Sequence, residues 1–480
     1  MIGSLAISLI MFGIVTKAVR QTKEAREYAQ IALARQLGAQ AQSLSLMVNP
    51  KHEAAFLLAI QSMRLMPSGE AAQILLDSPL AHQVSLMSFD GHVYAVAFSP
   101  DGKNVAAGSD DHTVRVWEAL TGKETTRFLH DGTVSFVRFS PNGKYLVSST
   151  GFEENSVHVW EVDSGKEIVH LKYDSSLNYV STIAISPDGK YMIPVVGYDN
   201  TFAVLELATG KEIRRFAHDE AAIDGVAFVA FSSSGRYIVS AGGSDNTVRV
   251  WDVSTGREIA RMTHSTGVWS ATFSPDENLV VSITDTTARV WDAFTGREVA
   301  HMTHDGYAYR AVFSPDGKYI ASGGYDGTVR IWEATTGKEV TRMAFENHLV
   351  FIAYSPDGKY ILTEGGGNVV PLVQVWETRT GKEIARTRGD VRSMTFSPDS
   401  RFIASANFDG TARVWQYLPE DLIAGACLFA PRNLTQAEWR QYIGDALPYQ
   451  TVCPNLPIEL TPAPLINTTP TAYPSSTPSL

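Results

Sequence analysis

The chain has 480 residues, which is long for one ordinary core and favours either several domains or a repetitive architecture. It has 40 Lys and Arg residues and 51 Asp and Glu residues, which give a net charge of −11. After residue 80 there are 33 basic and 46 acidic residues, and this acidic excess excludes the basic surface that nucleic acids require. With two cysteines, Cys427 and Cys453, it has no disulfide framework and no thiolate metal cluster, and a single bridge between them stays open.

Residues 1–19 form an apolar segment. Residues 2–15 carry no charge, and basic residues follow at Lys17, Arg20, Lys23 and Arg26. The run is shorter than the roughly 20 residues of a spanning helix, and it has neither the basic start nor the small-residue cleavage site of a signal peptide. We interpret residues 2–19 as a membrane anchor, with a packed apolar helix or a truncated spanning segment as alternatives. If they span a membrane, the basic residues predict that the following chain is cytoplasmic.

Residues 20–80 predict a helical neck. The segment from Thr16 to about Val48 is free of Pro, rich in Ala, Gln and Leu, and repeats apolar residues at helical spacing. Pro50 interrupts this helix, a second follows in "HEAAFLLAIQSMRLM", and Ser68 caps a third short one. Because no clean heptad persists, we expect the neck to pack on the next domain, with a dimeric coiled coil as the alternative.

Residues 83–417 repeat one pattern about every 40 residues. The stretch "FSPDGKYIASGGYDGTVRIWEATTGKE" at 313–339 shows its three turn signals, "SPDG", "YDG" and "TGKE". In "SPDG" the Pro fixes φ, the Asp accepts local hydrogen bonds and the Gly tolerates a positive φ, which predicts a tight turn between two strands. The "TGKE" signal lacks the Ser or Thr and the upstream Gly of a phosphate loop, so we interpret it as a hairpin turn rather than a nucleotide site.

Tryptophans mark the end of the third strand in each repeat. They stand at 117, 160, 251, 291, 332, 376 and 415, which leaves a gap of 91 residues between the second and the third. Leu205 splits this gap into 45 and 46, so we count it as a repeat whose Trp is replaced. That makes eight three-stranded units. No outer strand follows Trp415, so the strand near residues 83–89 is expected to close the last unit and leave no open sheet edge.

This pattern resembles the WD-repeat family of β-propellers, in which a Trp followed by an acidic residue ends the third strand of each blade. Asp follows Trp251 and Trp291, and Glu follows four of the other tryptophans. The resemblance implies an all-β fold: an eight-bladed WD-repeat β-propeller, preceded by the α-helical neck and followed by a short C-terminal helical unit.

The family's blades often carry a hydrogen-bonded set of Trp, Ser or Thr, His and Asp. By position the sets are His218, Ser240, Asp245 and Trp251 in blade 4, His264, Ser282, Asp285 and Trp291 in blade 5, and His304, Ser322, Asp326 and Trp332 in blade 6, with a partial match of His130, Ser148, Glu154 and Trp160 in blade 2. Because the trio of Ser, His and Asp recurs, we interpret it as structural. We predict no catalytic residue, no metal site and no cofactor. Blade 3 should lack the set, with Leu205 in an apolar contact between blades.

Partners of the family commonly bind at positions that flank the first buried aliphatic residue of the innermost strand, and at the residue before the turn Asp. In this chain those positions hold mostly aromatic residues: His92, Tyr94, Tyr179, Tyr198, Trp269, Tyr307, Tyr309, Tyr325 and Phe408. Tyr and Trp supply interface energy at low entropic cost, so we predict a protein or peptide partner on this loop face. The alternative is that the rings only cover the hydrophobic channel.

Residues 418–457 predict a C-terminal helical unit. Thr435 and Glu438 have the spacing of a capping box, and Gly444 is expected to stop that helix. Cys427 and Cys453 flank the unit, and in a cytoplasmic protein we expect them as thiols. Residues 458–480 are rich in Thr, Pro and Ser and are expected to be disordered.

Neck, propeller and closing unit together resemble the C-terminal portion of bacterial signal-transducing NTPases of the STAND class, in which the propeller senses a signal. This chain has no NTPase and begins at the apolar run, so we interpret it as a stand-alone sensor or a fragment of a split gene. The leading hypothesis is a non-enzymatic scaffold or sensor for a protein or peptide, tethered to a membrane. The alternatives are a hydrolase or lyase acting at the channel mouth, and a regulatory domain for a separately encoded NTPase.

Overall fold

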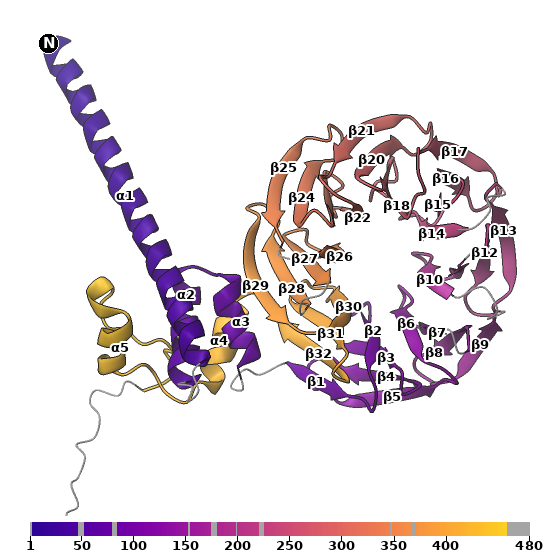
Figure 1. Ribbon diagram of the computed structural model, residues 1–480, viewed down its shortest axis with the longest axis horizontal. Coiled ribbons are helices and arrows are strands. Elements are labelled where there is room, and N and C mark those ends of the chain that lie inside the picture. Colours follow the sequence, from indigo (N-terminus) through magenta and orange to yellow (C-terminus); the bar gives the residue numbers. More distant parts are fainter. Residues whose placement is uncertain are drawn as a thin grey trace, which may run out of the picture.

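The computed structural model describes residues 2–46, 52–78, 84–151, 154–173, 180–197, 199–219, 225–345, 348–366 and 371–457, with side chains from residue 23 onward. Eight four-stranded antiparallel sheets stand as blades in a ring around one axis (Figure 1). The prediction of eight blades is thus confirmed. The predicted disorder of residues 458–480 concerns a segment outside the described residues.

Each blade runs from an innermost strand at the axis to an outermost strand at the rim (Figure 1). From inside outward, blade 1 holds β2 (Val93–Phe98), β3 (Asn104–Ser109), β4 (Thr113–Glu118) and β5 (Glu124–Leu129); blade 2 holds β6 (Val134–Phe139), β7 (Tyr145–Thr150), β8 (Ser156–Glu161) and β9 (Glu167–Lys172). Blade 3 holds β10 (Val180–Ile185), β11 (Tyr191–Val196), β12 (Thr201–Glu206) and β13 (Glu212–Ala217); blade 4 holds β14 (Val226–Phe231), β15 (Tyr237–Gly242), β16 (Thr247–Asp252) and β17 (Glu258–Thr263).

The second half of the ring repeats the plan. Blade 5 holds β18 (Ser270–Phe273), β19 (Leu279–Thr284), β20 (Thr287–Asp292) and β21 (Glu298–Thr303); blade 6 holds β22 (Ala308–Phe313), β23 (Tyr319–Gly324), β24 (Thr328–Glu333) and β25 (Glu339–Ala344). Blade 7 holds β26 (His348–Tyr354), β27 (Tyr360–Gly366), β28 (Leu372–Glu377) and β29 (Lys382–Arg388); blade 8 holds β30 (Val391–Phe396), β31 (Phe402–Asn407), β32 (Thr411–Gln416) and β1 (Ser85–Ser88).

The middle strands are buried on both faces because each blade stacks on its neighbours. In β16 every residue of "TVRVWD" is buried, whereas the outer strand β17 alternates buried and more exposed residues. One core cluster joins Val239 and Val248 of blade 4 to Ala271 and Trp291 of blade 5. The other clusters join neighbouring blades in the same way, so the core consists of separate clusters between the blades.

The ring closes through β1, which precedes the first blade in sequence and pairs antiparallel with β32 of the last. Met87 of β1 is buried in a cluster with Trp117 of blade 1 and Val414 of blade 8, while its neighbour Leu86 is exposed. The first and last blades are thus held together by one strand and one shared core, and β32 has no open edge.

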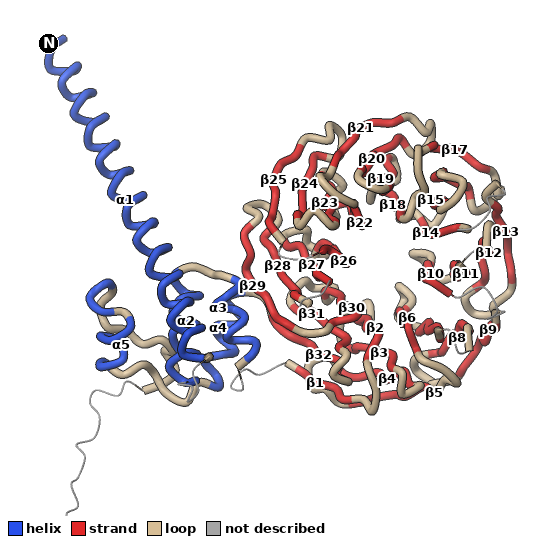
Figure 2. The backbone as a smooth tube through the Cα atoms, viewed as in Figure 1, coloured by secondary structure: helices blue, strands red, loops and turns tan. Residues whose placement is uncertain are grey.

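Helices gather beside the ring next to β29 (Figure 2). Helix α1 (Ile2–Ser45) is continuous through the apolar segment and projects away from the propeller, and α2 (His52–Leu65) and α3 (Gly69–Asp77) fold back against it (Figure 1). One cluster joins Leu37, Phe56 and Leu75 of these helices to Ile384 of blade 7. Among the described residues, no helix combines the length and apolarity needed to cross a membrane.

The C-terminal unit contains α4 (Pro419–Phe429), α5 (Gln436–Tyr442) and a 3-10 turn η1 (Gly444–Ala446). Thr435 and Glu438 form the predicted capping box, and Gly444 has a φ of +65°. Trp439 is buried in the cluster that contains the neck helices and blade 7. The closing unit and the neck therefore share a core, although they lie at opposite ends of the sequence.

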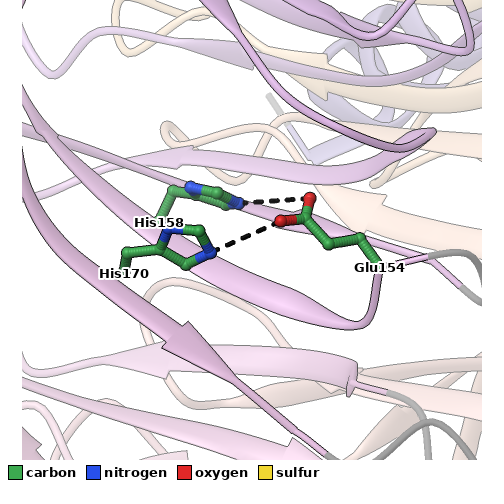
Figure 3. Close-up of side chains that lie close together, drawn as sticks. All are labelled: Glu154, His158 and His170. Atoms are coloured by element: carbon green, nitrogen blue, oxygen red, sulfur yellow. Dashed lines mark ion pairs between the residues drawn. The ribbon is translucent and has the colours of Figure 1, made fainter.

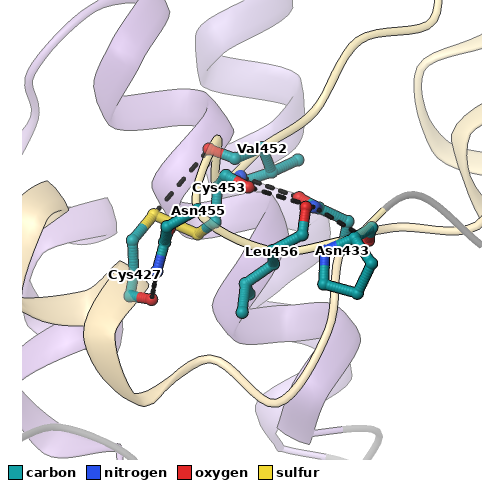
Figure 4. The surroundings of a disulfide bond; sticks show 7 residues. Cys427, Asn433, Val452, Cys453, Asn455 and Leu456 are labelled. Atoms are coloured by element: carbon teal, nitrogen blue, oxygen red, sulfur yellow. Dashed lines mark hydrogen bonds between the residues drawn. A yellow bond between two sulfur atoms is a disulfide. The ribbon is translucent and has the colours of Figure 1, made fainter.

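The prediction that the cysteines are thiols is wrong. Cys427 and Cys453 form a disulfide, with Cα atoms 5.3 Å apart (Figure 4). Asn433 brings the two ends of the unit together, since its side chain donates to the carbonyl of Cys453 at 3.0 Å and accepts from the Cys453 N–H at 2.7 Å. The prediction rested on the expected compartment, whereas the packing of α4 against the last turns decides the distance between the sulfur atoms.

Candidate partner-binding face

Four aromatic side chains surround one cavity of about 650 Å³ on the loop face of blades 3 to 6. They are Trp269, Tyr307, Tyr309 and Tyr325, each between 46 and 59% exposed. The cavity wall also includes Phe228 of β14 and the two charged side chains Asp285 and Arg310. We call the four residues the aromatic rim.

The backbone holds the aromatic rim in place. In β22 Ala308 is buried and Tyr309 is exposed, and a register shift between Ala308 and Arg310 turns the strand where it meets β23. A Cβ on Gly324 would lie 1.7 Å from the carbonyl oxygen of Tyr307, so only Gly lets the strands approach this closely. The N–H of Tyr325 donates to that same carbonyl at 2.7 Å. The rim is thus positioned before any partner binds.

The tyrosine rings of blade 6 also support one another. The ring centroid of Tyr325 lies 6.4 Å from those of Tyr307 and Tyr309, and 4.7 Å from that of His348, which the sequence reasoning did not include. Such tilted and edge-on arrangements are favourable for aromatic pairs. The sequence could have indicated His348, because this residue stands at the start of an innermost strand.

The other predicted positions form a second group between blades 8 and 1. The ring centroid of Phe408 lies 4.7 Å from His92 and 5.4 Å from Tyr94, and the guanidinium of Arg392 lies 3.9 Å from its ring centroid. His92 Nδ1 is hydrogen-bonded to the backbone carbonyl of Phe408. The predicted aromatic ring is therefore divided into two groups. Tyr179 and Tyr198 lie outside the described residues.

The polar set predicted for blade 4 is complete. His218 Nδ1 lies 2.8 Å from Asp245 Oδ2, and His218 Nε2 lies 2.7 Å from Ser240 Oγ. Trp251 Nε1–H donates to the same hydroxyl at 2.8 Å. Burial alone would raise the pKa of Asp245, but hydrogen bonds from His218 and Thr247 outweigh it and hold the pKa well below the ordinary value. Blade 6 repeats the arrangement with His304, Ser322, Asp326 and Trp332.

In blade 5 the assignment of Asp285 is wrong. His264 Nε2 and Trp291 Nε1 both reach Ser282 Oγ, at 3.1 and 2.8 Å, but His264 Nδ1 has no hydrogen-bond partner. The cause is a shorter turn, since only two residues separate β19 from β20, against three between β23 and β24 of blade 6. Asp285 therefore faces the cavity of the aromatic rim instead.

Blade 2 departs from the set in a different way. His130 Nε2 and Trp160 Nε1 meet at Ser148 Oγ, at 2.8 and 3.0 Å. Glu154 does not reach His130, whose Nδ1 has no hydrogen-bond partner, so the assignment of Glu154 to this set is wrong. Its carboxylate lies beside His158 and His170 (Figure 3). The turn differs as well, since five residues separate β7 from β8, against four between β15 and β16 of blade 4.

Blade 3 has the apolar contact predicted for Leu205. This side chain is buried in a cluster with Val147 and Val159 of blade 2 and Ile183 and Met192 of its own blade. The replacement of Trp by Leu thus leaves an interface between blades whose buried core is aliphatic, with Phe136, Tyr145 and Tyr173 packed against it.

Glu364 of β27 is a buried carboxyl group that the sequence reasoning missed. Blades 6 and 8 have small residues at the strand position that corresponds to Glu364, namely Gly323 and Ala406. Burial raises the pKa of Glu364 to about 7. The sequence could have indicated this buried carboxyl group, because Glu364 is a charged residue where the neighbouring blades have small ones.

Glu364→Gln is expected to stabilise the protein above about pH 7 by about 3 kcal/mol, with little effect below pH 4.5. Between pH 4.5 and about 7 Glu364 is ionised in the unfolded chain but keeps its proton in the folded protein. The free energy of unfolding of the wild type therefore falls as the pH rises through this range. Urea unfolding of both proteins at several pH values measures the difference. A difference that does not change with pH would contradict the assignment.

Comparison with known proteins agrees with this geometry. Residues 180–416 match the family model described as IFT122 first beta-propeller, and residues 83–118 and 122–161 match the WD domain, G-beta repeat. The protein is a β-propeller that contains WD40 repeats. The WD40 propeller also resembles the solved structure of the computationally designed Ika8 protein, with a TM-score of 0.58 and 25% identity over 70% of this chain and 100% of that one.

Three curated relatives share short stretches with the WD40 propeller. Ribosome biogenesis protein erb1 of Neurospora crassa is 37% identical over 86 residues, which are 18% of this chain and 11% of that protein. Protein hir1 of Emericella nidulans is 42% identical over 66 residues, or 12% and 6% of the two chains. Transcription initiation factor TFIID subunit 5 of Caenorhabditis elegans is 39% identical over 59 residues, or 12% and 9%. The matched stretches thus span about a tenth or less of each relative.

Proposed function

We propose that the chain is a non-enzymatic interaction scaffold that binds a peptide segment of a partner protein in the cavity of the aromatic rim. The observation that carries this proposal is the exposure of Trp269, Tyr307, Tyr309 and Tyr325 around one cavity. Exposed Tyr and Trp clustered at a concave site are the side chains that dominate binding energy in protein interfaces. Asp285 and Arg310 in the wall would select a segment that carries both charges.

Two further considerations support binding rather than catalysis. A hydrolase or lyase needs paired groups for proton transfer. Among the described residues of the cavity wall, Asp285 supplies the carboxylate and Arg310 the other charged group. One relative that shares the repeats is named as a subunit of a transcription initiation factor, so by its name that relative belongs to a protein assembly. Both observations favour a scaffold.

The test is selection of peptides from a random display library on the full chain, followed by titration of the best peptide. The variant Trp269→Ala/Tyr307→Ala/Tyr309→Ala/Tyr325→Ala is expected to weaken its binding at least about 100-fold, because hot-spot residues each contribute about 2 kcal/mol or more. Its melting temperature should stay within about 3 °C of the wild type, since exposed side chains contribute little to stability.

The matched control is Phe294→Ala/Tyr319→Ala. These aromatic residues are also exposed. Phe294 lies in the turn between β20 and β21 and Tyr319 is the first residue of β23, so both lie at the other ends of the strands, because neighbouring strands are antiparallel. This variant should bind the peptide as the wild type does. Equal binding by the rim variant, or a library that yields no specific peptide, would contradict the proposal.

The finer roles expected from the sequence stay predictions. They are a sensor role beside a separately encoded NTPase and membrane attachment through residues 2–19. Co-purification of an NTPase with the full chain, and sedimentation of the chain with membranes without detergent, test them separately from the peptide experiment.

A further inference from the structure

Blade 2 brings three potential metal ligands together. Glu154 lies in the turn between β7 and β8, His158 is on β8 and His170 is its cross-strand partner on β9. Their ligand atoms all lie within 4.8 Å of one another. His170 Nε2 is 3.4 Å from Glu154 Oε1, and His158 Nε2 is 3.7 Å from Glu154 Oε2 (Figure 3).

The other blades show what these positions normally hold. In blade 4 the equivalents of the two histidines are Arg249 and Arg261, which are also cross-strand partners, and Arg249 forms an ion pair with Asp245 at 2.7 Å. Blade 6 has the pairs Arg330 with Arg342 and Arg330 with Asp326. A guanidinium stays protonated and cannot bind a metal ion, whereas a neutral imidazole can. Blade 2 has exchanged both arginines for ligands.

A second carboxylate orients the imidazoles. Glu167 Oε1 accepts a hydrogen bond from His158 Nδ1–H at 2.7 Å and lies 3.6 Å from His170 Nδ1. With the proton on Nδ1, His158 Nε2 accepts a hydrogen bond from Ser156 Oγ at 2.6 Å and lies 3.7 Å from Glu154 Oε2. A carboxylate behind a metal-binding imidazole is the usual arrangement in zinc sites.

The Glu154 carboxylate is buried, and the permanently charged group beside it belongs to the exposed Lys172. Its side chain is 6% exposed, and neither oxygen has a hydrogen-bond partner. Besides the imidazoles it has the ammonium of Lys172 at 3.4 Å, on a side chain that is 62% exposed and free to turn into solvent. A buried carboxylate without hydrogen bonds is costly, and a bound cation would offset that cost.

We propose that Glu154, His158 and His170 bind a divalent transition-metal ion, with Zn²⁺ as the best fit. In a tetrahedral zinc site with bonds of about 2.0 to 2.1 Å, neighbouring ligand atoms are about 3.4 Å apart. The two imidazole–carboxylate separations, 3.4 Å to Oε1 and 3.7 Å to Oε2, are close to this value, and the three side chains, whose ligand atoms lie within 4.8 Å of one another, draw together around the ion. The hydroxyl of Ser156, which lies 2.6 Å from His158 Nε2, gives way to the ion and keeps its contact with Thr150 at 2.9 Å.

Three protein ligands leave one coordination position open. His170 is 34% exposed, so the ion enters from solvent at the rim of the propeller, and a water molecule takes the fourth position. The site joins β8, β9 and the turn before them, and it is separate from the aromatic rim of blades 5 and 6. It therefore does not depend on the proposed peptide binding.

The test is isothermal titration of the full chain with Zn²⁺, with Co²⁺ absorption as the report on coordination. We expect one equivalent bound with micromolar or tighter affinity, the visible bands of tetrahedral Co²⁺, and a higher melting temperature with zinc. His158→Arg/His170→Arg should weaken binding at least about 100-fold and still fold, because it restores the residues of blades 4 and 6. Glu154→Gln should also lose the high-affinity site.

His301→Arg is the matched control, because His301 lies on an outermost strand, as His170 does, and its Nδ1 is 3.4 Å from Glu298 Oε1. It should leave zinc binding unchanged. Absence of the one-equivalent transition in the wild type, or the same transition in the His158→Arg/His170→Arg variant, would overturn the proposal.

Discussion

Met87→Asp is expected to lower the free energy of unfolding by about 4 kcal/mol or more and to promote aggregation. Met87 is 2% exposed and fills the core between blades 8 and 1, where an aspartate carboxylate would be buried without a charged partner in that apolar cluster. Losing β1 would also leave β32 as an open edge strand, which can pair with other chains. Urea unfolding and light scattering measure the two effects.

Leu86→Asp is the control for this prediction. Leu86 is the next residue of β1 but is 52% exposed, so the same change on the outer side of the strand should alter stability by less than about 0.5 kcal/mol. If both variants were equally stable, the ring would not depend on β1 for closure.

Reduction of the disulfide is expected to lower stability by about 3.5 kcal/mol, the loop entropy of a bridge that joins residues 26 apart. Because the C-terminal unit shares its core with α1 to α3, the neck should loosen with it. Urea unfolding with and without reductant measures the loss. Cys427→Ser/Cys453→Ser should resemble the reduced wild type and show no response to reductant. Equal stability in both conditions would contradict a structural role for the bridge.

Much of the fold follows from turn chemistry and counting. The "SPDG" and "TGKE" signals recur in register, and the spacing around Leu205 reveals a repeat without its Trp. Since a blade needs four strands, the missing partner of β32 had to come from before the first blade. These inferences depend on local backbone preferences and on the strand count, which are encoded in short stretches of sequence.

The side-chain contacts were less predictable, because a single residue changes them. One residue fewer in the β19–β20 turn removes Asp285 from the His264 set and places it in the cavity. In blade 2 a Glu in the turn, together with histidines at two Arg positions, forms a candidate metal site beside the His130 set. The disulfide depends on packing between distant segments, which spacing along the chain does not show.

Photo-crosslinking of the selected peptide tests the aromatic rim most directly. A photoreactive phenylalanine analogue is placed in turn at Tyr309, at Tyr325 and, for comparison, at Tyr319, at the opposite end of β23 from Tyr325, and at Tyr28 of α1, all of which are exposed. The account predicts crosslinks from Tyr309 and Tyr325 and none from Tyr319 or Tyr28. Crosslinks from Tyr319 or Tyr28 alone would show that the partner binds elsewhere and would contradict the proposed site.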